Sequence, residues 1–160
     1  MKSLFIVCLV AASLFAIAPP ASAQNVDDLI ELLRHDINTE ATALMTVALD
    51  LDSAQSEIFW PIWREYNLER SKTGDAQLAL LKEYADHQLT MDDEKAKYYS
   101  EQAFKIEESR LKLRKKYWKK VNKEIGGIIA ARFVQVDRQL SNLMQVQISS
   151  QVPLVQTMSK

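Results

Sequence analysis

Apolar residues recur three and four positions apart over most of this chain, and few helix-breaking residues interrupt them. After residue 23 the breakers are limited to Gly74, Gly126, Gly127, Pro61 and Pro153, well below ordinary usage. Alternating spacings of three and four place apolar side chains on one face of an α-helix. The sequence therefore predicts an all-α fold of about four helices, built on a long antiparallel helical hairpin or cradle.

The first 23 residues have the pattern of a secretory signal peptide. Lys2 supplies a positive start, residues 4–18 are mainly apolar, and residues 21–23 (Ala-Ser-Ala) form a cleavage site of small side chains. This mainly apolar stretch of 15 residues is too short to span a bilayer comfortably, since a spanning helix takes roughly 20. We expect cleavage before Gln24 and export to the periplasm of a Gram-negative bacterium.

The expected mature chain is long enough for one domain. We predict a single helical domain over residues 24–152 and a flexible tail over residues 153–160. The one cysteine, Cys8, precedes the expected cleavage site, so the mature fold cannot rely on disulfides. Its stability must come from packing, to which a homodimer would add further buried surface.

Charge is divided unevenly along the chain, although the net charge is only −1. Residues 24–108 carry 19 acidic and 8 basic side chains, whereas residues 109–160 carry 2 acidic and 11 basic ones. The simplest interpretation is that the basic segment lies against the acidic helices within one fold. Nucleic acid is not an expected partner, because export separates the protein from it.

The first two helices are expected on either side of Asp52. The first covers residues 26–48, with an apolar face formed by Val26, Leu29, Ile30, Leu33, Ile37, Ala41, Leu44 and Ala48. The second begins after Leu51 and Asp52, because Asp52 with Gln55 three residues later is a capping pattern. It should run as one helix, bent at Pro61, to about Ala85. Its apolar stripe contains Ile58, Phe59, Ile62, Trp63 and Tyr66.

The third and fourth helices are expected on either side of Gly126 and Gly127. The third begins at about Met91 with Thr90 as its N-cap. Its inward positions are Ala96, Tyr99, Ala103, Ile106, Arg110, Leu113 and Tyr117. The buried charge of Arg110 should be paired with a carboxylate or reach solvent. The fourth helix uses Ile129, Phe133, Val136, Leu140 and Leu143, and ends before Pro153.

No group of residues in the sequence has the pattern of an active site. A glycine-rich phosphate loop is absent, and so is a nucleophile motif with a paired base. Glu31 and His35 share a helical face, but a zinc site normally takes three or four protein ligands. We therefore expect no enzymatic activity and no cofactor, with Glu31 and His35 as weak metal candidates only.

The densest cluster of one charge is a basic run of seven cations without an acid, interleaved with apolar residues. We call it the basic run; it consists of Lys112, Arg114, Lys115, Lys116, Lys119, Lys120 and Lys123. It is either a solvated face that balances the acidic half or a binding surface for acidic protein segments or anionic lipid headgroups. The expected binding residues are Trp60, Trp63, Phe104, Leu111, Lys115, Lys116, Trp118 and Lys119.

The capping segment carries a family resemblance. Residues 51–55 (Leu-Asp-Ser-Ala-Gln), followed by residues 59–63 (Phe-Trp-Pro-Ile-Trp) and Tyr66, resemble the Spy/CpxP-like family of periplasmic proteins, whose hallmark is an L-T-x-x-Q motif at a helix start. Asp52 stands where that motif has threonine, and residues 89–93 (Leu-Thr-Met-Asp-Asp) echo it with Asp in place of Gln. The chain is thereby similar to a divergent member of the family.

The resemblance implies a cradle of long helices, often an antiparallel dimer. It also implies action as an ATP-independent chaperone or as a stress-response adaptor that restrains a membrane sensor kinase; some relatives bind zinc. Our hypothesis is a periplasmic protein that binds unfolded clients or an envelope sensor through an apolar and basic helical surface. A zinc-responsive binding protein and a dedicated kinase inhibitor are the alternatives.

Overall fold

A computed structural model describes residues 39–155, with the side chain of Gln151 left out. Apart from Thr39, these residues belong to one compact unit, Glu40–Lys160. The expected signal peptide, most of the first predicted helix with Glu31 and His35, and residues 156–160 lie outside the described part. Within it, the helices are a segment over residues 39–49, α2 (Ser53–His87), α3 (Asp93–Glu124) and α4 (Gly127–Gln151), with a 3-10 turn, η1 (Gln88–Thr90).

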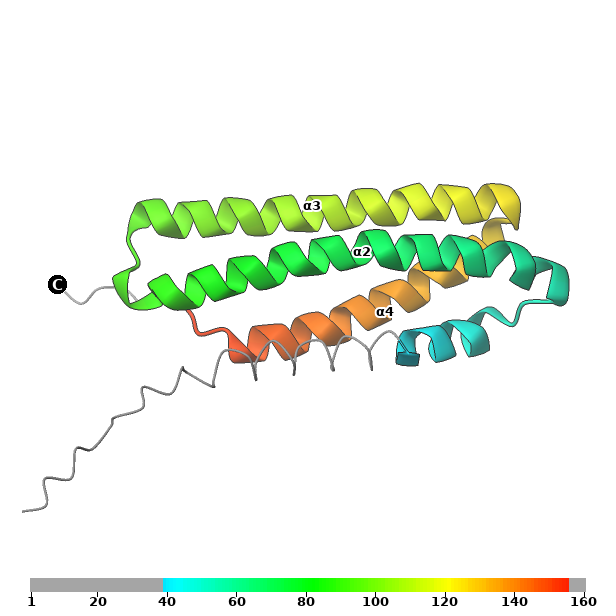
Figure 1. Ribbon diagram of the computed structural model, residues 1–160, viewed down its shortest axis with the longest axis horizontal. Coiled ribbons are helices and arrows are strands. Elements are labelled where there is room, and N and C mark those ends of the chain that lie inside the picture. The colour runs from blue at the N-terminus through cyan, green and yellow to red at the C-terminus, as the bar shows by residue number, and fades with distance from the viewer. Residues whose placement is uncertain (1–38, 156–160) are drawn as a thin grey trace, which may run out of the picture. The chain divides into compact units, whose positions relative to one another are not determined.

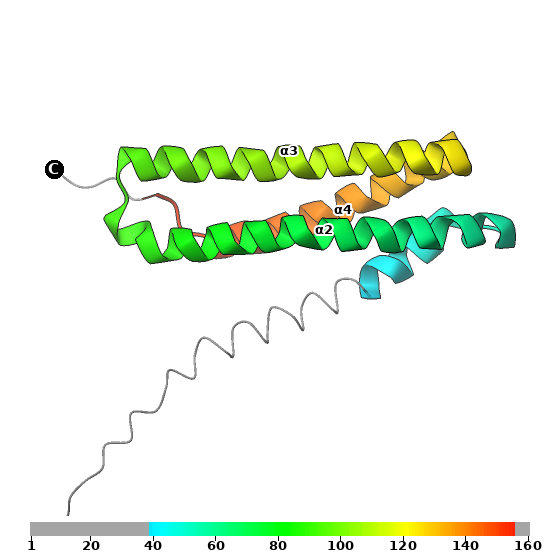
Figure 2. The same cartoon turned by 45° about the horizontal axis from the view of Figure 1, so that its top comes forward.

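No residue between 39 and 155 is in a β-strand, so the all-α prediction is confirmed for the described chain. The long helices α2 and α3 lie side by side and antiparallel, joined at one end by η1 (Figures 1 and 2). The chain then turns back into α4, which packs obliquely on α3. The predicted antiparallel hairpin is therefore present, and α2 continues through Pro61 as one helix.

Local capping chemistry fixes where α2 and α3 begin. The Asp52 carboxylate accepts a hydrogen bond of 2.8 Å from the Gln55 backbone N–H, and the Gln55 side chain accepts one of 3.2 Å from the Asp52 N–H. The predicted capping box is confirmed. The predicted N-cap of α3 is wrong: Asp92, not Thr90, accepts from the Lys95 N–H at 2.8 Å.

The displaced cap has a physical reason. The Thr90 hydroxyl donates backward to the His87 carbonyl at 3.3 Å and so completes η1. Met91 and Asp92 are extended, and only then does α3 start. A carboxylate at this position also favours the positive end of the helix dipole. The turn between α3 and α4 depends on Gly126, whose φ of 126° lies in a region that side chains disfavour.

The main hydrophobic core fills the half of the hairpin that is nearest the α3–α4 turn. Phe133 of α4 meets Phe59, Trp63 and Tyr66 of α2 edge to face, with ring centroids 5.3 to 6.2 Å apart. Such contacts stabilise the fold beyond what the buried area of each ring contributes. The buried apolar residues of this core are Ala41, Met45, Leu49, Phe59, Ile62, Trp63, Tyr66, Leu113, Tyr117, Val121, Ile129, Ala130, Phe133, Val136 and Leu140.

The structure corrects four positions of the predicted stripes, because Leu44, Ile58, Ala103 and Leu143 are exposed. Leu44 is 49% exposed and Leu143 is 64% exposed, so neither faces the core. Met45 and Leu49 are buried in place of Leu44, because the helical segment turns its Ala41 face inward. Trp63, expected on a binding surface, is 2% exposed and donates from Nε1 to the Thr42 hydroxyl at 3.2 Å.

Candidate functional site

The basic run divides between two faces of α3. Three of its cations point toward the rest of the fold: Lys116 pairs with Glu69 at 2.6 Å, Lys120 pairs with Glu65, and Arg114 pairs with Asp137. Glu65 and Glu69 belong to α2. The expectation that the basic segment lies against the acidic helices is confirmed for Lys116 and Lys120, whereas Arg114 pairs with an acid of the basic segment itself. Lys116, predicted as a binding residue, therefore already has an intramolecular partner.

These contacts perturb the acidic side chains on α2. The hydrogen bond from Lys116, helped by one from the Tyr117 hydroxyl at 2.8 Å, lowers the pKa of Glu69 below its usual value. The hydrogen bond from Lys120 likewise lowers the pKa of Glu65. Burial, followed by the hydrogen bond to Glu69, raises the pKa of Tyr117. The phenol therefore stays neutral and donates its proton.

The other face of α3 carries cations that have no such partner. Lys112, Lys115 and Lys119 are exposed and form no ion pair with any described side chain. They accompany three large apolar residues of α3 that remain in contact with solvent, namely Phe104 (64% exposed), Leu111 (48%) and Trp118 (39%). The free cations of the basic run and its exposed apolar residues thus occur together on one helix.

Phe104, Leu111 and Trp118 are seven residues apart, so they follow one line along α3. We call this line the outward row. The core-facing line of the same helix runs through Tyr99, Leu113, Tyr117 and Val121, on a different side. A spacing of seven residues is about 10.5 Å along a helix. The row therefore extends about 21 Å from Phe104 to Trp118.

Charge changes sign along the outward row. The exposed charges near Phe104 are of both signs, with Glu101, Glu107 and Glu108 outnumbering Lys97 and Lys105, whereas those near Leu111 and Trp118 include the unpaired bases Lys112, Lys115 and Lys119. Glu101 has one weak contact, with Lys97 at 3.9 Å. Glu108 and Lys115 lie seven residues apart, on the same side of the row. The Phe104 end of the row therefore has a small excess of acids, and the Trp118 end has an excess of bases.

The two tryptophans of α2 that were expected in the same surface lie elsewhere. Trp60 is half-buried and packs edge to face on Phe59, with ring centroids 5.2 Å apart. Trp63 belongs to the core. Of the predicted binding residues, the structure therefore brings together Phe104, Leu111, Lys115, Trp118 and Lys119 on α3.

Two open grooves mark the surface of the bundle. One, of about 380 Å³, lies between α2 and α3, and its lining includes Lys72, Ala76, Leu80, Tyr98, Lys105 and Ile106. The other, of about 500 Å³, is lined by residues of the 39–49 segment, Asp50 and α4, among them Val47, Arg132 and Gln139. Neither groove is lined by a residue of the outward row.

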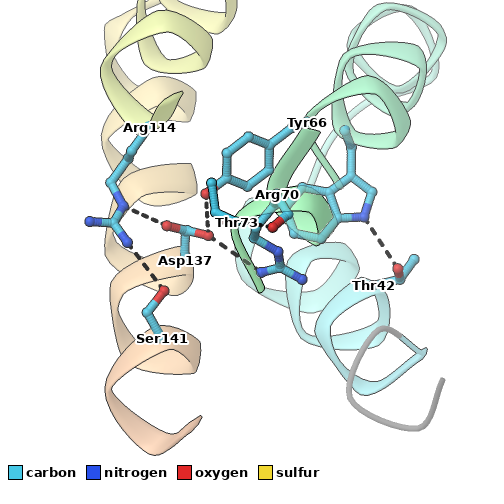
Figure 3. A network of polar contacts seen from close by, with 8 residues as sticks. Thr42, Tyr66, Arg70, Thr73, Arg114, Asp137 and Ser141 are labelled. Atoms are coloured by element: carbon cyan, nitrogen blue, oxygen red, sulfur yellow. Dashed lines mark hydrogen bonds and ion pairs between the residues drawn. The ribbon is translucent and has the colours of Figure 1, made fainter. Parts of the chain in front are cut away.

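A buried carboxylate joins α2, α3 and α4, and the sequence analysis did not anticipate it. Asp137 of α4 has no exposed surface. Its carboxylate accepts hydrogen bonds from the Tyr66 hydroxyl at 2.7 Å and from Arg114 Nε at 2.5 Å (Figure 3). Arg70 Nη1 lies 3.6 Å from it, and Arg114 also donates to the Ser141 hydroxyl at 3.1 Å.

The network is closed to small molecules, since its central carboxylate is fully buried. Burial, followed by the negative charge of Asp137, raises the pKa of Tyr66, so the phenol remains a hydrogen-bond donor. A sequence signal for this site did exist. Asp137 is one of only two acids after residue 108, and it lies on the buried side of α4 between Phe133 and Leu140.

Arg110, the charged residue predicted in the seam of α3, is half-buried. Its guanidinium donates to the side-chain oxygen of Gln77 on α2, a neutral partner rather than a carboxylate. Burial lowers the pKa of Arg110 below its usual value. The side chain nonetheless stays charged at neutral pH, because arginine titrates far above it.

Within residues 39–155, no three His, Cys, Asp or Glu side chains are grouped so that they could hold a metal ion. The same residues contain no helix with the length and apolar character needed to cross a membrane. No protein-family model, no curated protein and no solved structure matches this chain.

Proposed function

We propose that this chain is a periplasmic, ATP-independent chaperone-like protein or envelope-stress adaptor that acts by binding other proteins, without catalysis. On this proposal it is a divergent relative of the Spy/CpxP-like proteins. The observation that carries the proposal is the outward row, in which Phe104, Leu111 and Trp118 stay exposed beside unpaired lysines. Exposed apolar side chains beside charges are typical of surfaces that bind other proteins.

The mechanism would be reversible binding. Unpaired lysines such as Lys115 and Lys119 would accelerate the encounter with acidic segments through long-range attraction. Apolar contact with Leu111 and Trp118 would then hold the client, since burying apolar area contributes about 25 cal/mol per Å². No nucleotide is needed for either step.

The test is suppression of aggregation. The mature chain, residues 24–160, is mixed without ATP with a client protein that aggregates when dithiothreitol reduces its disulfides, and light scattering is followed. The reductant leaves the mature chain intact, because residues 24–160 contain no cysteine and therefore no disulfide. We expect scattering to fall as the molar ratio rises. Undiminished scattering at several-fold molar excess would count against the proposal.

A matched pair of variants distinguishes binding by the outward row from nonspecific binding by exposed apolar residues elsewhere. Leu111→Ser with Trp118→Ser removes two exposed apolar residues from the row, whereas Leu68→Ser with Leu89→Ser removes two others that are 67% and 80% exposed. The first double variant should lose most of the suppression, and the second should retain it. Equal loss in both would assign the activity to exposed apolar surface in general.

A further inference from the structure

We propose that the outward row docks one amphipathic α-helix of a partner protein, antiparallel to α3, with its acidic end at Trp118 and its basic end at Phe104. This inference rests on the proposed function and specifies the chemistry of the partner. It goes beyond that function because it assigns one secondary structure, one direction and one charge pattern to the bound segment.

The spacing of the row selects a helix. Apolar residues seven positions apart recur about every 10.5 Å along α3, and a second helix with a heptad pattern repeats its apolar side chains at the same interval. An extended strand repeats the side chains of one face about every 6.6 to 7 Å, so it falls out of step within one repeat. A helix of three heptads matches the row from Phe104 to Trp118.

The unpaired charges, together with the helix dipole, select the direction. Lys115 and Lys119 have no carboxylate partner among the described residues, in contrast to Lys116 and Lys120, which pair with α2. Carboxylates of a partner would meet this need at the Trp118 end. Glu107 and Glu108 are exposed toward the Phe104 end of the row, where cations of the partner helix would pair with them. Because acids stabilise the N-terminal end of a helix through its dipole, we take the acidic end of the partner as its N-terminal half, and such a helix binds antiparallel to α3.

The same charges disfavour a lipid surface. An anionic membrane would attract the lysines beside Trp118, but it would repel Glu101, Glu107 and Glu108 at the other end of the row. A planar surface also cannot supply opposite charges at two points about 21 Å apart. A discrete helix can supply both.

The probe is a synthetic helical peptide of about 21 residues, three heptads long. It has leucines at the first and fourth position of each heptad, glutamates beside them in its N-terminal half and lysines in its C-terminal half. Binding to the full mature chain is measured by fluorescence anisotropy at low salt. We expect saturable binding that Lys115→Glu with Lys119→Glu weakens by about tenfold or more.

The matched control is Arg64→Glu with Lys72→Glu, which makes the same change in net charge at exposed positions of α2, away from the row. It should leave the affinity within about twofold. Charge-swap rescue provides the sharpest reading: a peptide with lysine in place of every glutamate should bind the Lys115→Glu/Lys119→Glu chain better than the unchanged chain. Equal weakening by both double variants, or no rescue, would overturn the proposal.

Direction is read by disulfide formation, since the mature chain has no cysteine of its own. Lys115→Cys should cross-link faster to a cysteine in the acidic half of the peptide, and Glu108→Cys faster to one in the basic half. The opposite preference would overturn the antiparallel arrangement. Both positions are exposed, so we expect the variants to keep the helicity of the wild type. Circular dichroism checks this first.

Two other occupants are outcomes of the same experiments. If light scattering finds a dimer that Lys115→Glu/Lys119→Glu converts to a monomer, and the peptide does not bind, a second copy occupies the row and the proposal fails. If only phosphatidylglycerol vesicles bind, the proposal also fails. If the chain still suppresses client aggregation in either case, the proposed function stands although the docking proposal fails. If the unmodified chain does not suppress aggregation, the proposed function fails, whatever the peptide does.

Discussion

The Tyr66 hydroxyl donates a hydrogen bond of 2.7 Å to the carboxylate of Asp137, a residue 71 positions further along the chain. Arg114 approaches the same carboxylate from α3. One fully buried acid therefore fixes the relative positions of three helices. Buried charges are retained only where partners compensate for the loss of water.

Removing this acid should destabilise the fold strongly. Asp137→Ala leaves Arg70 and Arg114, whose side chains are 14% and 18% exposed, without their carboxylate. We expect a loss of about 3–5 kcal/mol in the free energy of unfolding. Urea denaturation followed by circular dichroism measures it. The exposed Glu57→Ala is the control and should remain within about 0.5 kcal/mol of wild type. A loss below about 1 kcal/mol in Asp137→Ala would contradict this role.

The cap of α3 offers a direct comparison of two neighbouring residues. Asp92→Ala removes the acceptor of the Lys95 N–H and should cost about 1 kcal/mol. Thr90→Ala removes only a hydroxyl that bonds backward at 3.3 Å and should cost less than half as much. The urea midpoints of the two variants show which residue caps α3. A larger loss in Thr90→Ala than in Asp92→Ala would mean that Thr90 is the N-cap, as the sequence pattern predicted.

The division of the basic run should be visible in stability. Lys116→Glu with Lys120→Glu places acids beside Glu69 and Glu65, so the thermal unfolding midpoint should fall. Lys115→Glu with Lys119→Glu makes the same change in net charge on the side without ion pairs, and its midpoint should stay near that of wild type. Similar midpoints for both variants would mean that the pairs with α2 are too well solvated to contribute.

The Lys116–Glu69 pair should lose its contribution in acid. Because the pKa of Glu69 is lower in the fold than its usual value of 4.5, its stabilisation is present above about pH 4.5 and disappears as the pH falls through the folded-state pKa. A double-mutant cycle of Glu69→Gln and Lys116→Gln should show coupling at pH 7 and much less at pH 3. Unchanged coupling at pH 3 would rule out the ionised pair.

Local chemistry made much of the fold predictable. The Asp52–Gln55 capping box, the glycine turn at Gly126 and the repeated apolar spacings depend on residues close in sequence, so they predict α2, α3 and α4 apart from the N-cap of α3. The spacings failed at Leu143, where the pattern favours an apolar residue but α4 has passed the end of the main core and the side chain is 64% exposed.

The candidate site was predictable only in part. Phe104, Leu111 and Trp118 fall outside the seam of their own helix, which is visible in the sequence. The division of the lysines is not, because it depends on which carboxylates of α2 come within reach of Lys116 and Lys120 after folding. Asp137 was missed for the same reason, since its partners are 23 and 71 residues away.

Since the main core occupies only the half of the hairpin that contains Trp63 and Tyr117, the two ends of α2 and α3 should differ in how readily they open. Amide hydrogens beside those residues should exchange with deuterium only when the whole molecule unfolds, whereas those of residues 75–85 should exchange through local opening. The angle between the two long helices would then be adjustable at the η1 end of the hairpin, while the half that contains Trp63 and Tyr117 remains folded.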